Sequence, residues 1–178
     1  LNELVIYYQN NLGGESSKRL EDLYRQTGLK KYQLELLKKG EWHEQAKAIS
    51  DLSSMRMAEV LFEVLQYTDD ENIHVRNEAQ YASVKLGGKK ALSFLDDLRT
   101  PLSEWQQIRL LDQALKLDYE VLENIGSWLT SENDGVVIFA LRLARHLNQY
   151  QELEQIIKLL YHRNHEVQFH AIETTVEL

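Results

Sequence analysis

A register of apolar and small side chains recurs along the sequence at intervals of about 31 residues. Each occurrence is followed by further apolar or small residues at helical spacing, so we expect each to open an amphipathic helix. The intervals are 33, 31, 30 and 31 residues and separate five positions, Trp42, Val75, Gln106, Val136 and Val167. A nearly constant period indicates a repeat architecture rather than an irregular helical bundle.

Each interval also holds a second apolar segment. The segments read MAEVLFEVLQY, KALSFLDDLRT, YEVLENIGSWLTS and ELEQIIKLLYHR, with large apolar residues at equivalent places, Leu61, Phe94, Ile125 and Ile156. Because neither helix of a pair is apolar all round, each pair leaves a face that only a neighbouring pair can cover. Short side chains at Ala79, Ala140 and Ala171 would let neighbouring helices approach closely.

The composition agrees with a chain of helices. Leu, Glu, Gln, Lys and Ala dominate the 178 residues, alternating strand patterns are scarce, and there is one proline. Helix-end signals are also present: Thr68 with Glu71, and Ser103 with Gln106, have the spacing of a capping box. The glycine pair 87–88 suits a helix C-terminus. We therefore predict an all-α fold.

The turn before Val75 resembles the corresponding turn of the HEAT-repeat family. Asp70, Val75 and Arg76 have the spacing typical of a HEAT unit, and Ala79 and Leu86 follow at matching positions. The later units carry other residues where the arginine would stand, namely Gln107, Val137 and Gln168. The resemblance implies a right-handed α–α superhelix, a HEAT-like solenoid of about five helix pairs with an N-terminal helical cap.

On this reading the chain has two parts. Residues 1–28 lack the repeat register and form the N-terminal helical cap, and residues 29–178 form the repeat array. The expected helix pairs lie near 29–54, 56–87, 89–117, 119–148 and 150–178. An alternative for the first part is a membrane-proximal segment, because LVIYY lies near its start and residues 1–40 carry seven basic and five acidic residues.

The helix that opens with Val-Arg lines the concave surface of HEAT proteins, so the resemblance implies which side chains would face a partner. These are Arg76, Tyr81, Lys85, Arg109, Lys116, Arg142, Arg145 and His146. The first helices of the pairs would present an acidic outer surface through Glu59, Glu63, Glu120, Glu123, Glu152 and Glu154. We expect a non-catalytic scaffold that binds a protein or an extended peptide on the solenoid surface.

The alternative is a HEAT-like nucleic-acid-binding module of the DNA glycosylase type. Arg109, Arg142, Arg145, Tyr81 and Trp105 could supply its cationic and aromatic contacts. The formal net charge of −8 argues against this alternative, because a chain that repels phosphate overall is a poor general binder of nucleic acid. We expect nucleic acid to be an unlikely partner.

The residues do not form a convincing catalytic or metal-binding set. His165 and His170 are five apart, which places them on different sides of a helix, and His162 falls in the preceding turn. The adjacent acidic pairs 69–70 and 96–97 do not converge on one point if they are helical. With no cysteine in the chain, thiolate chemistry is excluded. We expect no cofactor and no enzymatic activity.

The sequence has no run of eighteen apolar residues. We expect a cytoplasmic protein, or the soluble part of a membrane-anchored one. The chain begins at Leu1 rather than methionine, so we expect further residues before it. Any membrane contact would then be made through that preceding segment.

Overall fold

The structure, a computed structural model, describes residues 1–116 and 125–178, with Lys89 described by its backbone only. These residues are helical, with no strand among them, which confirms the predicted all-α class. They divide into two compact units, Leu1–Gly87 and Gly88–Leu178. The predicted start of the pair 119–148, with Leu117, lies outside the described residues. The predicted boundary at Gly28 falls between two helices of the first unit.

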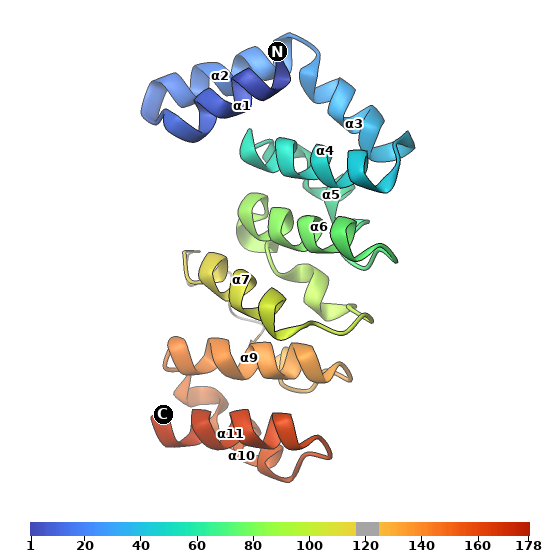
Figure 1. The fold of residues 1–178 in the computed structure, drawn as a ribbon. Coiled ribbons are helices and arrows are strands. Elements are labelled where there is room, and N and C mark those ends of the chain that lie inside the picture. The colour runs from blue at the N-terminus through green and yellow to red at the C-terminus, as the bar shows by residue number, and fades with distance from the viewer. Residues whose placement is uncertain (117–124) are drawn as a thin grey trace. The chain divides into compact units, whose positions relative to one another are not determined.

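The first unit contains α1 to α6 (Figure 1). Their bounds are α1 Asn2–Asn11, α2 Gly14–Gln26, α3 Leu29–Lys39, α4 Trp42–Ser54, α5 Leu61–Leu65 and α6 Ile73–Leu86. A short 3₁₀ turn, η1 Ala58–Val60, precedes α5. Helix α4 packs against both α3 and α6, and Figure 1 shows α4 and α6 side by side. The buried core of this unit is continuous and includes Tyr24, Leu37, Ile49, Leu52 and Met55.

The second unit contains α7 to α11. Their bounds are α7 Glu104–Ala114, α8 Ile125–Trp128, α9 Asp134–His146, α10 Leu153–Lys158 and α11 His165–Glu177. Two short 3₁₀ turns, η2 Gly88–Lys90 and η3 Ser93–Asp96, precede α7. Two more, η5 Tyr150–Glu152 and η6 Leu159–Tyr161, stand before and after α10. Helix α9 packs against α7 and against α11, so these three form one layer, with α10 behind α11 in the view of Figure 1.

The repeat register is largely confirmed as a pattern of burial. Val75, Ala79 and Ser83 of α6 are buried, and so are the residues 30 or 31 positions further on in each later second helix, apart from Thr175. The equivalent first-helix residues Leu61, Phe94, Ile125 and Ile156 are buried too. Burial at these positions leaves the polar residues of each helix to form its outer side.

The predicted register of α4 is wrong. Trp42 is exposed, whereas Ala48 and Leu52 are buried and stand 31 positions before Ala79 and Ser83. The tryptophan begins α4 and stacks on His74 at a ring-centroid distance of 5.2 Å. The sequence pattern predicted a buried Trp42, because a large aromatic residue at the start of an amphipathic helix is usually taken to face the core.

When α4 is aligned in this way, the same position in α4, α6, α7 and α11 carries a side chain that reaches back to the segment before its helix. The Nη1 of Arg76 donates to the carbonyl oxygens of Asp70 and Glu71. At the equivalent places, side-chain amides donate to carbonyls of the preceding segment: Gln45 to Leu37, Gln107 to Leu102, and Gln168 to His162. Each such bond gives a backbone carbonyl near the turn a side-chain donor, and the Leu37 carbonyl accepts a second one from the Tyr67 hydroxyl. Glutamine therefore replaces the expected arginine in the same role.

The unit with Val137 at this position uses a neighbouring residue instead. Asn133 caps α9 through its Oδ1, which accepts from the N–H of Gly135, while its Nδ2 donates to the carbonyls of Leu98 and Thr100. The next cap, Asn164, likewise donates its Nδ2 to Asp134 at 2.7 Å. Cap residues thus tie successive turns of the second unit together.

The helix ends confirm some predictions and correct others. The capping box of Ser103 and Gln106 is present. The predicted box of Thr68 and Glu71 is wrong, because Asn72 caps α6 and the Thr68 hydroxyl donates to the Leu65 carbonyl. Gly88 adopts a positive φ of 47°, as expected after a helix.

The first helices of the predicted pairs 56–87 and 89–117 are shorter than expected. The segment 90–100 forms only 3₁₀ turns, so the helix expected there is wrong, and α5 has five residues. A few residues fixed by one or two hydrogen bonds cannot form a stable helix without packing, and 3₁₀ geometry serves such short segments. Among the described residues, no helix is both long and apolar enough to cross a membrane.

Candidate functional site

The residues predicted to line a concave surface are divided between the two units. Arg76, Tyr81 and Lys85 belong to α6 of the first unit. The other five, Arg109, Lys116, Arg142, Arg145 and His146, belong to α7, the residues after it, and α9 in the second unit. In the second unit, α9 carries Arg142 and Arg145 and packs against α7, α8 and α11.

Arg142 and Arg145 connect α9 to its neighbours through ion pairs. Arg142 lies 3.3 Å from Glu104 of α7 and 3.3 Å from the Nε2 of His170. Arg145 lies 3.1 Å from Glu173 and 3.3 Å from Glu177, both on α11. The two arginine side chains are only 12% and 20% exposed. They link helices of the fold and present little free positive charge.

The other predicted contacts also have local roles. Arg76 holds the turn before its own helix, and Lys116 pairs with Asp112 at 2.8 Å. The pKa of Lys85 is lowered by burial of its ammonium group and by the nearby charge of Arg56, although the residue as a whole is exposed. His146 is exposed, and Tyr81 is half-buried. Because Arg142 and Arg145 are held by carboxylates of neighbouring helices, they are poorly placed to recruit an acidic partner.

The predicted acidic outer surface is only partly free. Glu59 accepts from Arg25 at 3.0 Å and from Lys30 at 3.2 Å. Burial alone would raise its pKa, but these hydrogen bonds and charges lower the pKa to about 2. Glu154 pairs with Lys158, whereas Glu120 and Glu123 lie outside the described residues. Glu59 and Glu154 are therefore already engaged by basic side chains of this chain.

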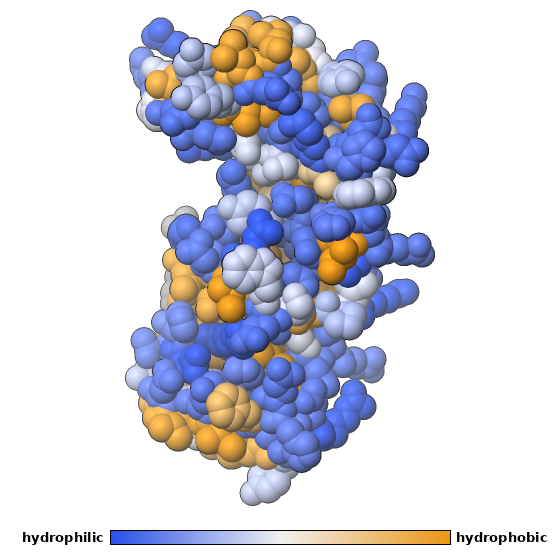
Figure 2. Space-filling model, viewed as in Figure 1, coloured by the Kyte–Doolittle hydropathy of each residue, from blue (hydrophilic) through white to orange (hydrophobic). Residues whose placement is uncertain are grey.

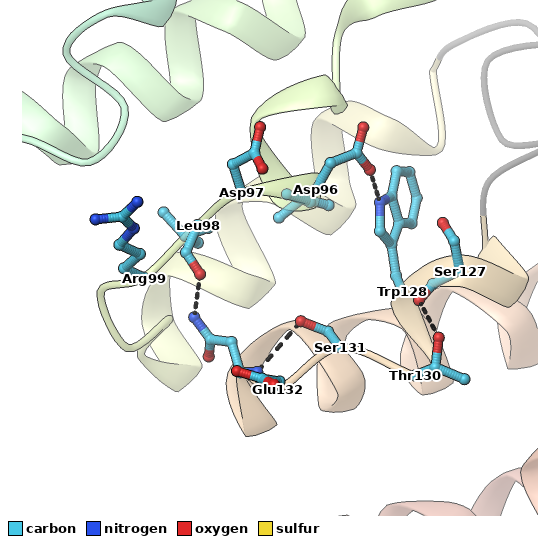
Figure 3. A pocket seen from close by; sticks show the side chains of 11 residues that line it. Asp96, Asp97, Leu98, Arg99, Ser127, Trp128, Thr130, Ser131 and Glu132 are labelled. Carbon is cyan, nitrogen blue, oxygen red and sulfur yellow. Dashed lines mark hydrogen bonds between the residues drawn. The ribbon is translucent and has the colours of Figure 1, made fainter.

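A polar recess lies in the second unit, where η3 and the turn after it face the α8–α9 turn (Figure 3). Its volume is about 640 Å³. Trp128 forms part of the wall, and its Nε1 donates to the Oδ1 of Asp96 at 2.7 Å. The Asn133 amide bonds described above close the opposite side, and the Thr130 hydroxyl donates to the carbonyl of Ser127. Internal hydrogen bonds therefore hold the walls in place.

The charged groups of this recess are mostly acidic. Asp96, Asp97 and Glu132 face a single cation, Arg99, which Figure 3 shows at the side away from Trp128. Asp97 and Glu132 form no hydrogen bond or ion pair with any described residue, and both are exposed. The recess thus combines a fixed wall with two unpaired carboxylates. In the sequence only the pair 96–97 stands out, because Glu132 is brought beside it by the fold.

A second polar cluster lies in the first unit, among α1, α3 and α4. Buried Asp51 accepts from Asn2 at 2.7 Å and from Gln33 at 3.2 Å, and lies 3.5 Å from Lys47. Burial raises the pKa of Asp51, while Asn2 and Lys47 oppose the rise. Tyr24 donates to Asn2 at 3.0 Å, and its pKa is raised by burial and then by Asp51. These partners are distant in the sequence, so no sequence motif predicts that they meet.

His162, which precedes α11, and His165 and His170, which lie on it, have separate hydrogen-bond partners. His162 accepts from the N–H of Asn164, His165 lies 3.0 Å from Gln168, and His170 lies 3.0 Å from Glu173. Within the described part of the chain, no three His, Asp or Glu side chains are placed to hold a metal ion. These histidines take part in helix starts and interhelical contacts.

The sequence matches no protein-family model. A comparison with curated proteins also found no match. The likeness to HEAT repeats therefore rests on the residues of this chain, and the recess of the second unit is the candidate site with free charge.

Proposed function

We propose that this chain is a HEAT-like α-solenoid that acts as a non-catalytic scaffold and binds a basic, extended segment of a protein partner. The solenoid is supported by the recurring burial register and by the side-chain donors that close four of the turns at the same place. In the second unit, α9 packs against α7 and α11, which is the nearest-neighbour contact typical of repeat proteins.

The observation that carries the choice of partner is the acidic recess. Its volume of about 640 Å³ is within the range of ligand sites, yet its lining is polar and open, which suits part of a peptide better than a buried small molecule. The unpaired carboxylates of Asp97 and Glu132 favour a cationic guest. A lysine or arginine there would form charge-assisted hydrogen bonds, and its aliphatic stem could lie along the wall that contains Trp128.

The same charges disfavour the nucleic-acid alternative. Arg142 and Arg145, its main cationic contacts, are occupied by Glu104, Glu173 and Glu177. Phosphate binding would require these arginines to exchange their partners, and the remaining carboxylates would repel the incoming backbone. A basic peptide meets no such barrier at the recess.

The proposal is tested by titrating the chain with a short Lys/Arg-rich peptide and measuring the binding heat at low and moderate salt. We expect Asp97→Asn combined with Glu132→Gln to weaken binding on the order of tenfold, about 1.4 kcal/mol. A matched control, Asp112→Asn combined with Glu154→Gln, also removes two negative charges, but from other helices of this unit. It should leave the affinity for the peptide unchanged.

Two results would contradict the proposal. Equal weakening by the control pair would mean that the peptide senses only the overall negative charge. Absence of peptide binding, together with salt-dependent binding of a DNA duplex, would return the function to the nucleic-acid alternative.

A further inference from the structure

Arg99 is a free cation in the acidic recess. It is exposed and forms no hydrogen bond or ion pair with any described residue. The arginines of α9 differ, since Arg142 and Arg145 are held by carboxylates. Figure 2 shows hydrophilic side chains over most of α9, which Figure 1 places in the same view. A hydrophilic surface alone therefore does not identify a free charge, whereas the lack of a partner among the described residues does.

The recess keeps its opposite charges apart. Asp96 accepts from the indole N–H of Trp128 at 2.7 Å, and Figure 3 shows Arg99 at the side of the recess away from that tryptophan. Leu98, which precedes Arg99, is only 6% exposed, and its carbonyl accepts from Asn133 at 3.0 Å. These contacts fix the backbone that joins the two charges. One cavity therefore has a negative side and a positive side.

Two effects follow for a peptide that enters the recess. The free carboxylates of Asp97 and Glu132 attract a basic side chain. Arg99 repels a second basic side chain at its own side, and a guest that covered it without a counter-charge would leave its guanidinium desolvated and unpaired. An acidic side chain removes both penalties, because a guanidinium can donate two parallel hydrogen bonds to one carboxylate.

We propose that the partner segment carries an acidic residue two positions from its basic residue, and that Arg99 binds this carboxylate. The inference rests on the proposed function of the recess and adds the specificity of that site. Side chains two positions apart lie on the same side of an extended segment, roughly 7 Å from each other. A cavity of about 640 Å³ can hold both charged groups. Arg99 thus distinguishes a segment of mixed charge from a polybasic one.

Two short peptides with blocked ends test the inference by isothermal titration calorimetry at low salt. The mixed peptide has Lys-Ser-Glu-Ser-Lys at its centre, which reads the same in either chain direction, and the polybasic peptide has Lys-Ser-Lys-Ser-Lys. We expect Arg99→Glu to weaken binding of the mixed peptide about fivefold, the upper value for an exposed ion pair, and to strengthen binding of the polybasic peptide. The neutral variant Arg99→Gln should give smaller changes of the same signs.

The matched control is Arg163→Glu, which reverses another exposed arginine that has no partner among the described residues and lies just before α11. It gives the chain the same net charge as Arg99→Glu, but it should change the affinities for both peptides only slightly and in the same direction. Circular dichroism of each variant confirms that helix content is that of the wild type.

The opposite signs separate this inference from the proposed function. If Arg99→Glu changes the two affinities as Arg163→Glu does, Arg99 does not bind the acidic residue, and the inference fails while the site for a basic peptide stands. If the wild-type chain binds neither peptide, the proposed function and the inference fail together.

Discussion

At the residue scale, Arg145 shows how the fold determines the role of a charge. The sequence places it on a predicted binding surface, but in the structure it holds Glu173 and Glu177 of the next helix. A surface arginine tolerates replacement with little change in stability, typically about 0.5 kcal/mol. An interhelical arginine that is mostly covered does not, because its removal leaves two carboxylates side by side.

We therefore expect Arg145→Glu to lower the free energy of unfolding by about 1–3 kcal/mol, because it creates a cluster of three carboxylates. Urea unfolding followed by circular dichroism measures the change. Lys116→Glu, at an exposed position on the same unit, serves as the control and should shift the midpoint far less. Equal effects of the two variants would show that the pairs with α11 do not stabilise the fold.

Ala140 marks a close contact between helices. It is fully buried in the middle of α9, so Ala140→Trp forces an indole into a space filled by neighbours and should cost about 1–3 kcal/mol or more. Thermal melting measures the loss, with Lys85→Trp as an exposed control. Gln80 is unsuitable as a control, since it is buried and donates to the Thr68 carbonyl. A wild-type melting temperature in Ala140→Trp would refute the register.

Glu59 gives the first unit a pH dependence with a definite sign. Its pKa is lowered from 4.5 to about 2, so the folded state favours the charged form, and its contribution is complete above about pH 4.5 and disappears as the pH falls through 2. Because the side chain is 39% exposed, we expect about 1 kcal/mol or less. Glu59→Gln should have a lower melting temperature than the wild type at pH 7, and the two melting temperatures should become equal near pH 2. If the difference in melting temperature between the two proteins grew as the pH fell, Glu59 would not stabilise the fold through its charged form.

At the scale of the element, the glutamine at the start of α11 replaces an arginine in closing the turn. Gln168 donates to the His162 carbonyl over the same six residues that separate Arg76 from the Asp70 carbonyl. We expect Gln168→Arg to retain stability, whereas Gln168→Leu leaves that carbonyl without its donor and costs about 1–3 kcal/mol. Urea unfolding of the two variants checks this, and a similar loss in both would mean that the bond is unimportant.

The elements also show how far the sequence predicts this molecule. The long second helices could be predicted, because eleven to fourteen residues give several turns in which the apolar period is visible. The short length of α5 and the 3₁₀ turns before α7 could not be predicted. A short α-helix and a few 3₁₀ residues place apolar side chains at nearly the same spacing, so the sequence does not distinguish them. The site was predicted poorly for a different reason: whether Arg142 is free or paired depends on Glu104, which lies 38 positions away.

At the scale of the whole molecule, the first unit has a continuous core of its own. That core runs from Val5 to Leu86 and contains only residues of this unit. We expect a fragment of residues 1–87 to be helical and to melt cooperatively, because its apolar surface is buried within itself. Circular dichroism across a thermal scan is the test, with a non-cooperative, gradual loss of helix as the contrary result. Scrambling the sequence of the fragment provides the unfolded reference.

The turn-closing glutamines have a consequence for the mechanics of the second unit. Amide groups neither titrate nor attract counter-ions, so the bonds from Gln107 and Gln168 keep their strength when ionic strength or acidity changes. The links from α9 to α7 and α11 through Arg142 and Arg145 include charges that salt screens. Rising salt should therefore weaken the charged links of α9 to α7 and α11 more than the amide bonds that close the turns.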